Sequence, residues 1–207
     1  MQTGARSPIT ERRKEQTRLE VAREAVRLFA ANGVAATSGE DVARAVGVSV
    51  RTLWRYFPTK ESFVQPVLAT GIEATAAWLR DWPHDVALMD HLAARGRQMT
   101  GEVLAAGIDA EAFTAVLRLM RDEPALRSVW LQAHHEAEAV FGAVLADRAG
   151  GSPDSLEIRV QAAAINSALR VAAEQHAWHG LDNPAVAADP SVVYREALLA
   201  LSHVLPQ

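Results

Sequence analysis

The chain has 207 residues, of which 49% are hydrophobic and 22% are charged, so its composition is that of a globular protein long enough to bury a core. It contains no cysteine, which excludes disulfide scaffolds, thiol nucleophiles and cysteine-ligated zinc. No apolar run approaches the roughly 20 residues that cross a bilayer, and the N-terminus is polar where a signal peptide is apolar, so we expect a cytoplasmic protein. Alanine dominates the composition, which favours helices over sheets.

The net charge of −4 is unevenly divided along the chain. Residues 1–60 hold eleven Lys or Arg against six Asp or Glu, a net charge of +5, whereas residues 61–207 hold ten against nineteen, a net charge of −9. A basic N-terminal part on an acidic body indicates a small module that faces a polyanion. Composition alone does not distinguish DNA from RNA or a membrane surface.

The first predicted helix covers residues 17–32. Its apolar residues recur with a period of 3.6 and form one stripe, made of Val21, Ala22, Ala25, Leu28 and Phe29. Asn32 and Gly33 predict its end, because glycine readily takes the left-handed conformation that follows a helix.

Two short helices follow the first one. Ser38 and Asp41 have the spacing of a capping box at the start of the second helix, and Gly47 ends it. Ser49 is a good N-cap for a third helix over residues 50–57, which Pro58 closes. Two short helices joined by a glycine-containing turn, the second one basic on its outer face, predict a helix-turn-helix.

The rest of the chain is also predicted to be helical. We expect helices at about 60–80, 85–105, 109–120, 124–149, 154–179 and 190–205, and no segment has the alternation of a strand. Pro66 falls inside the fourth helix and predicts a kink or a late start, whereas Pro124 suits a first turn. The expected fold is all-α, with a helix-turn-helix domain in residues 1–60 and a helical domain in residues 61–207.

The segment from Val21 to Phe63 resembles the tetracycline-repressor (TetR-type) family, in order and without gaps. The resemblance is carried by Leu28-Phe29-Ala30-Ala31-Asn32-Gly33, Ala36-Thr37-Ser38, Asp41-Val42-Ala43, Ala45-Val46-Gly47-Val48-Ser49, Thr52-Leu53-Trp54-Arg55-Tyr56-Phe57 and Lys60-Glu61. It implies a homodimeric transcriptional regulator with a three-helix DNA-binding domain and a C-terminal domain that binds an inducer and dimerises.

The sequence departs from the family pattern at three positions. Gly39 stands where the family usually has an apolar residue, so we expect the start of the second helix to be loosely packed. Trp54 replaces the commoner Tyr, and Arg51 occupies a position that often has a small residue. No operator sequence follows from the resemblance.

The candidate DNA contacts lie on and around the third helix. Arg51 can donate to guanine O6 and N7 through two hydrogen bonds. The alternative is that Arg51 is a solvated surface residue without a base contact. The resemblance points to phosphate contacts at Thr37, Ser38, Tyr56 and Lys60; Ser38 has capping alone as its alternative, and Tyr56 has packing. The complete set is Thr37, Ser38, Ser49, Val50, Arg51, Thr52, Trp54, Arg55, Tyr56 and Lys60. A basic arm of Arg12, Arg13, Lys14 and Arg18 either touches the DNA backbone or minor groove or forms a solvated tail.

The body has a candidate ligand site between its helices. Apolar and aromatic residues with a few polar groups are typical of a small-molecule pocket, and ordinary core packing is the alternative for each residue. Asn166 and Arg170 are the best polar candidates, because they lie one helical turn apart in an alanine-rich stretch. The predicted set is Phe113, Leu117, Met120, Trp130, His134, Phe141, Asn166, Arg170 and Trp178.

The last two predicted helices have stripes at near-heptad spacing, which suit a four-helix interface between two copies. The stripes are Ile158, Ala162, Ile165 and Leu169 on the first helix, and Val193, Ala197, Leu201 and Val204 on the second. Burial within one chain is the alternative. A symmetric operator needs a symmetric reader, which favours the dimer.

Neither a metal site nor a cofactor is expected. His134 and His135 are adjacent and cannot share a helix face, and no carboxylate clearly accompanies His176 and His179. The sequence has no phosphate loop, nucleophile elbow or paired-carboxylate motif, so we expect no enzyme. The predicted function is a repressor that binds a palindromic double-stranded DNA operator and is released by a small-molecule inducer. The alternatives are a helical small-molecule-binding protein whose helix-turn-helix does not read DNA, and a helical enzyme.

Overall fold

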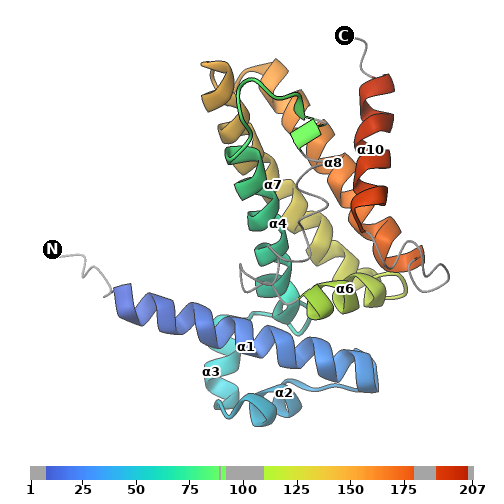
Figure 1. The fold of residues 1–207 in the computed structure, drawn as a ribbon. Helices are drawn as coiled ribbons and strands as arrows, with labels where there is room; N and C mark the ends of the chain where they lie inside the picture. Colours follow the sequence, from blue (N-terminus) through green and yellow to red (C-terminus); the bar gives the residue numbers. More distant parts are fainter. Residues whose placement is uncertain (1–7, 89, 92–109, 180–189, 205–207) are drawn as a thin grey trace, which may run out of the picture.

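The computed structural model of the chain describes residues 8–88, 90–91, 110–179 and 190–204, and in these residues all regular structure is helical (Figure 1). The prediction of an all-α fold is confirmed. The elements are α1 (Pro8–Asn32), α2 (Gly39–Val46), α3 (Val50–Tyr56), the 3₁₀ helix η1 (Glu61–Val64), α4 (Gln65–Arg80), α6 (Ala110–Leu119), α7 (Pro124–Ala149), α8 (Leu156–His179) and α10 (Pro190–Val204). Figure 1 places α2 and α3 on the far side of α1 from α7, α8 and α10. We call α1–α3 the head and the later helices the body.

Most helix bounds agree with the prediction to within two residues, and the starts of the first and fourth helices are the exceptions. α1 begins at Pro8, nine residues before the predicted position. Its first turns lack an apolar stripe and are supported instead by ion pairs one turn apart, Lys14 with Glu11 and Arg18 with Glu15. A search for apolar periodicity does not detect such a segment. The predicted helix over 85–105 lies for the most part outside the described residues.

Pro66 gives α4 a late start, which was one of the two predicted outcomes. The chain first forms η1, and α4 then begins at Gln65 with Pro66 in its first turn. The missing amide of proline costs little there, because first-turn amides have no partner inside the helix.

The predicted caps of the helix-turn-helix are present. Ser38 Oγ accepts from the Asp41 amide, and the Asp41 carboxylate accepts from the Ser38 amide, which completes the capping box of α2. Gly47 ends α2 with a φ of 75°, a conformation that favours glycine. Ser49 Oγ accepts from the Thr52 amide and caps α3.

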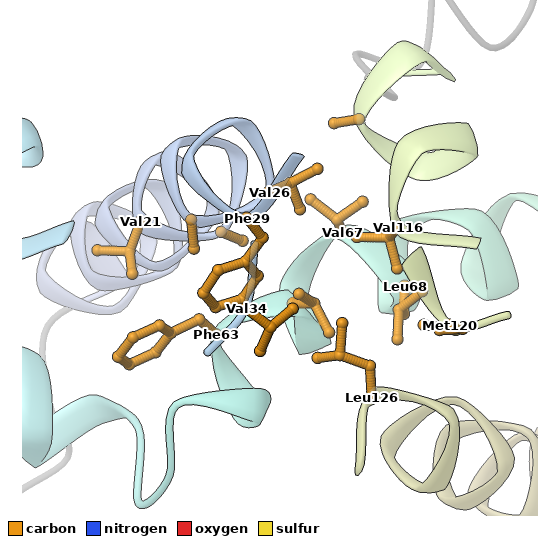
Figure 2. Close-up of a cluster of buried hydrophobic side chains, with 14 of the residues drawn as sticks. Val21, Val26, Phe29, Val34, Phe63, Val67, Leu68, Val116, Met120 and Leu126 are labelled. Carbon is orange, nitrogen blue, oxygen red and sulfur yellow. The ribbon is translucent and has the colours of Figure 1, made fainter. Parts of the chain in front are cut away.

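One hydrophobic core joins the head to the body. Figure 2 shows side chains of α1, η1 and α4 packed against side chains of α6 and α7. Val26 of α1 and Leu126 of α7 belong to the same buried cluster, as do Val67 of α4 and Val116 of α6. The proposed division at residue 60 therefore runs through shared packing, and the two-domain description remains a prediction.

A second core cluster holds α4, α7, α8 and α10 together, and it corrects the predicted dimer stripe. Ile158, Ala162, Ile165 and Leu169 are buried inside this single chain, where α8 packs against α7 and α10. Burial within one chain, the alternative reading, therefore holds for these four residues. Val193 is also buried, Ala197 and Leu201 are half-buried, and the Val204 side chain lies outside the described residues.

Among the described helices, none combines the length and the apolar character needed to traverse a lipid bilayer.

Candidate functional site

The helix α3 has one face in the core and one face in solvent. Leu53 is buried and Phe57, at the C-cap, is also buried, whereas Arg51 and Arg55 are exposed. Thr52 and Val50 are half-buried, and the Thr52 hydroxyl lies 2.8 Å from the Ser49 hydroxyl. A helix anchored on one side that presents two guanidinium groups on the other is the arrangement that major-groove reading requires.

Trp54 has a packing role that the sequence did not reveal. Its indole lies over Gly39 of α2, so that a Cβ built on Gly39 would overlap Trp54 Cζ2, and its ring centroid is 5.5 Å from that of Phe63. Gly39 is buried. The expectation of loose packing at the start of α2 is therefore wrong, because the tryptophan fills the space that the missing side chain leaves. Trp54 remains 40% exposed, so part of the ring is free for an outside contact.

Three of the predicted phosphate contacts have internal partners in the head. Thr37 is only 2% exposed, and its hydroxyl donates to the Gly33 carbonyl over 2.9 Å, so this conformation offers no surface for a phosphate at Thr37. The Ser38 hydroxyl donates to Asp41 Oδ2 over 2.5 Å. Lys60 Nζ donates to the Val34 carbonyl over 2.6 Å and so ties the start of η1 to the loop before α2. Each of these residues supports the geometry of the helix-turn-helix.

The capping carboxylate of α2 is held in its ionised form. Hydrogen bonds from the Ser38 hydroxyl and amide keep the pKa of Asp41 below its ordinary value, and the Arg44 guanidinium adds to this effect. The negative charge also lies at the N-terminal end of α2, where the helix dipole stabilises it.

The remaining basic residues of the head differ in their exposure and in their contacts within the chain. Arg55 packs over the Tyr56 ring, 5.0 Å from its centroid, and donates to the Tyr56 hydroxyl over 3.3 Å. Arg12 and Arg13 are exposed on α1, whereas Lys14 and Arg18 pair with glutamates of the same helix. The basic arm is thus part of a helix, and from Arg12 onward it is not an extended tail.

In the body, the structure gathers part of the predicted ligand set into a buried polar cluster between α7 and α8. His134 Nδ1 and Asn166 Oδ1 lie 2.6 Å apart, and Asn166 Nδ2 donates to the His134 carbonyl over 2.8 Å. Trp130 packs edge-on against His134, with 4.0 Å between ring centroids. We call Trp130, His134, Asn166, Arg170 and Glu174 the polar cluster.

Glu174 is the member of the polar cluster that the sequence analysis missed. Its Oε1 accepts from Trp130 Nε1 and from Arg170 Nη1, each over 2.8 Å, and its side chain is buried. The signal was present, because Glu174 follows Arg170 by four residues, the spacing at which opposite charges meet on a helix. The hydrogen bond from Trp130 connects this Arg170–Glu174 pair of α8 to α7.

Burial makes His134 a weaker base than an exposed histidine. Burial lowers the pKa of His134, because desolvation disfavours the imidazolium; the hydrogen bond with Asn166 opposes the shift in part. Its Nε2 atom is buried and has no hydrogen-bond partner among the residues that the structure describes.

The aromatic residue Phe113 connects the polar cluster to α4. Its ring centroid is 6.0 Å from that of Trp130 in an edge-on arrangement. Its other side fits against Gly71 of α4, where an added Cβ would come within 2.5 Å of Phe113 Cε2. A continuous line of contacts thus runs from α8 through α7 and α6 to α4.

The other predicted ligand residues do not join the polar cluster. Leu117 and Met120 are buried in the core shared by head and body, and Phe141 lies in the second core cluster. Trp178 Nε1 donates to the Leu117 carbonyl over 2.7 Å and the ring packs beneath Arg127. For these four residues the structure favours the alternative of core packing.

A separate open cavity of about 740 Å³ lies where the C-terminal end of α4 meets α7. Arg148 borders it, lies 3.5 Å from the centroid of the Trp82 ring, and donates to the carbonyls of Trp82, Pro83 and His84. None of the predicted ligand residues lines this cavity. Within the residues that the structure describes, no group of three or more His, Asp or Glu side chains could hold a metal ion.

The head and the start of α4 match the model of a known protein family. Residues 22–67 match the family model of bacterial regulatory proteins, tetR family. The chain is 30% identical over 145 residues to the HTH-type transcriptional regulator TcmR of Streptomyces glaucescens, a match that covers 69% of this chain and 64% of TcmR. The matched part is thus less than two thirds of the length of that relative.

Solved structures resemble the fold over nearly the whole chain. FadR from Bacillus subtilis in complex with stearoyl-CoA aligns with a TM-score of 0.55 at 15% identity, covering 88% of this chain and 96% of that chain. FadR from Bacillus halodurans aligns with a TM-score of 0.55 at 14% identity, covering 96% of both chains. GusR of Salmonella enterica aligns with a TM-score of 0.51 at 21% identity, covering 90% of this chain and 95% of that chain. At these identities the likeness establishes the fold alone.

Proposed function

We propose, from the premise that this chain is a TetR-type protein, that it is a transcriptional repressor that binds a palindromic operator as a homodimer and releases it on binding a small molecule. The observation that carries the proposal is α3, a capped helix with a buried face and an exposed face that presents Arg51 and Arg55. The family match covers this helix and the elements that hold it. The proposed setting is the cytoplasm, with neither cofactor nor catalytic step.

On DNA, the two arginines of α3 have different roles. Arg51 lies in the first turn of α3, the part of a recognition helix that reaches base edges, and a guanidinium pairs with guanine through two parallel hydrogen bonds. Arg55 lies in the last turn against Tyr56, where a contact with the sugar-phosphate backbone is the natural role. Arg44, exposed on α2, adds a second backbone contact.

The proposed dimer surface is the exposed face of α8 together with α10. Leu156, Val160 and Val171 of α8 are exposed, and they lie about half a turn away from the buried stripe of the same helix. On α10, Val192 and Leu199 are exposed as well. A second copy of this chain is the proposed occupant, because a palindromic operator has two half-sites and an isologous contact pairs the two heads.

The ligand acts through α4 in this proposal. α4 begins beside the head and packs against α1, α6 and α7, so a shift of α4 relative to the body changes the spacing of the two heads. A ligand achieves this only if it binds the DNA-free arrangement more tightly than the DNA-bound one. The complex of Bacillus subtilis FadR with stearoyl-CoA supports the idea that a protein of this fold holds a small molecule.

The test is binding to the DNA upstream of the protein's own gene, compared with random DNA of equal length. We expect a retarded complex on the upstream DNA with two chains per site, and weaker, salt-sensitive binding on random DNA. Equal affinity for both DNAs would exclude a sequence-specific regulator and leave the helical ligand-binding protein as the better description.

A further inference from the structure

The neighbours of His134 determine which of its ring nitrogens carries the proton. Asn166 Nδ2 donates to the His134 carbonyl over 2.8 Å, which fixes the orientation of the amide and turns its oxygen toward the ring. Nδ1 lies 2.6 Å from that oxygen. An amide oxygen can only accept, so Nδ1 must donate. In the neutral imidazole the proton is then on Nδ1 and Nε2 has a bare lone pair.

That lone pair is buried and has no hydrogen-bond partner in the described part of the chain. His134 as a whole is only 7% exposed, so bulk water does not satisfy the atom. Buried polar atoms of native proteins almost always have partners, and an exception needs an explanation. Since burial also lowers the pKa of His134, the atom is an acceptor at neutral pH.

The charges beside His134 are already balanced. Glu174 Oε1 accepts from both Arg170 and Trp130, so the single carboxylate and the single guanidinium of the polar cluster neutralise each other. A charged molecule beside His134 would have no counter-ion in this cluster, and burying an unpaired charge is very unfavourable. The aromatic rings of Trp130 and Phe113 supply the apolar surroundings.

We propose that the small molecule bound by the body is uncharged and largely apolar, and has a hydroxyl or N–H group that donates a hydrogen bond to His134 Nε2. The inference rests on the proposed function only in that the body binds a regulatory ligand. It adds the chemical class of that ligand and the atom that selects it. Because Trp130 contacts both His134 and Phe113, and Phe113 fits against Gly71, a ligand at His134 is also placed to act on α4.

The test uses three matched probes, namely phenol as a neutral donor, anisole as the same ring without a donor, and benzoate as an anion. Long-range ¹H–¹⁵N spectra of the histidine rings at pH 7.5 report the tautomer and the hydrogen bonding of each nitrogen. We expect His134 to have its proton on Nδ1, and phenol to shift the Nε2 resonance of His134 while anisole and benzoate do not. The inference is overturned if His134 has its proton on Nε2, if phenol leaves Nε2 unshifted, or if anisole or benzoate shifts it as much.

The variants H134F and H135F provide a matched pair, since the two histidines are adjacent and His135 is exposed. The preference for phenol over anisole in thermal stabilisation should disappear in H134F and persist in H135F. If H134F does not fold, the spectra of the unaltered protein decide the question alone. Operator binding without any probe is measured separately, so a protein that binds its operator but has no preference for phenol overturns only this inference.

Discussion

Gly39 and Trp54 form one packing unit between α2 and α3, although they lie 15 residues apart and each departs from the usual pattern of the family. The glycine leaves a space, and the indole occupies it while its ring packs at a tilt against Phe63 of η1. The two departures compensate each other, and the angle between the two helices of the helix-turn-helix depends on both.

The first prediction concerns this pair. G39A should destabilise the protein by about 1–3 kcal/mol, because the new methyl group overlaps the indole of Trp54, which also packs against Phe63. The double variant G39A/W54Y should recover much of the loss, since the smaller ring leaves room. Urea unfolding measures both, with G151A as the control because nothing lies near a Cβ there. A G39A protein as stable as the parent would contradict the packing argument.

The second prediction concerns base reading. R51A should weaken binding to the operator by about 1–3 kcal/mol and have little effect on random DNA. R121A, which removes an exposed arginine between α6 and α7, is the control and should change neither affinity. Equal losses on both DNAs would show that Arg51 contacts phosphate.

The third prediction concerns the dimer surface. V160E places a charge on the exposed face of α8 and should yield a folded monomer in sedimentation. V140E introduces the same charge on the exposed face of α7 and should leave the dimer intact. L169E, in contrast, should unfold the chain, because Leu169 is buried in the core of a single copy. A dimeric V160E protein would show that the copies meet elsewhere.

The fourth prediction concerns acid stability. Burial lowers the pKa of His134 from its ordinary value of 6.5, so below that pH the unfolded chain binds a proton that the folded chain resists. Stability should therefore be complete above pH 6.5 and fall as the pH decreases, with a slope of up to about 1.4 kcal/mol per pH unit from this residue. H134F should lack this component and H135F should retain it. Parallel stability curves for the two variants between pH 5 and 7 would refute the assignment.

The fifth prediction concerns the contact between α6 and α4. G71A pushes a methyl group against Phe113 and should weaken operator binding without any ligand, because the displaced partner is α4. F113A in the same background should restore the affinity, with a coupling energy of about 0.5–3 kcal/mol in the double-mutant cycle. Gel retardation measures the operator affinity of each variant, and urea unfolding measures its stability. Strictly additive effects on operator affinity would mean that this contact does not reach the head.

Local signals were enough to predict most of the helices. The serines at Ser38 and Ser49 and the glycine at Gly47 act through the nearest backbone groups, so a few residues of sequence determine where α2 and α3 begin and end. The polar start of α1 was not predicted, because salt bridges and not apolar spacing support it.

Relationships between distant residues were harder to predict. α8 is apolar on two opposite sides, and the sequence does not tell which side packs against α7 and which side stays exposed. The compensation between Gly39 and Trp54 requires the crossing of two helices to be known. Four of the five residues of the polar cluster were in the predicted ligand set. Glu174 was missed, although it follows Arg170 by four residues, because the sequence does not show that Trp130 donates to it.

The core that passes from α1 to α6 and α7 sets a limit on how the protein can be recombined with its relatives. A chimera that joins residues 1–60 of this chain to a foreign body would retain Val26 and Phe29 but lose Val116, Met120 and Leu126, against which the head packs (Figure 2). The transplanted head would then need new partners for its inner surface. For engineering hybrid sensors, the interchangeable unit therefore includes the facing side chains of α6 and of the start of α7 as well as the helix-turn-helix.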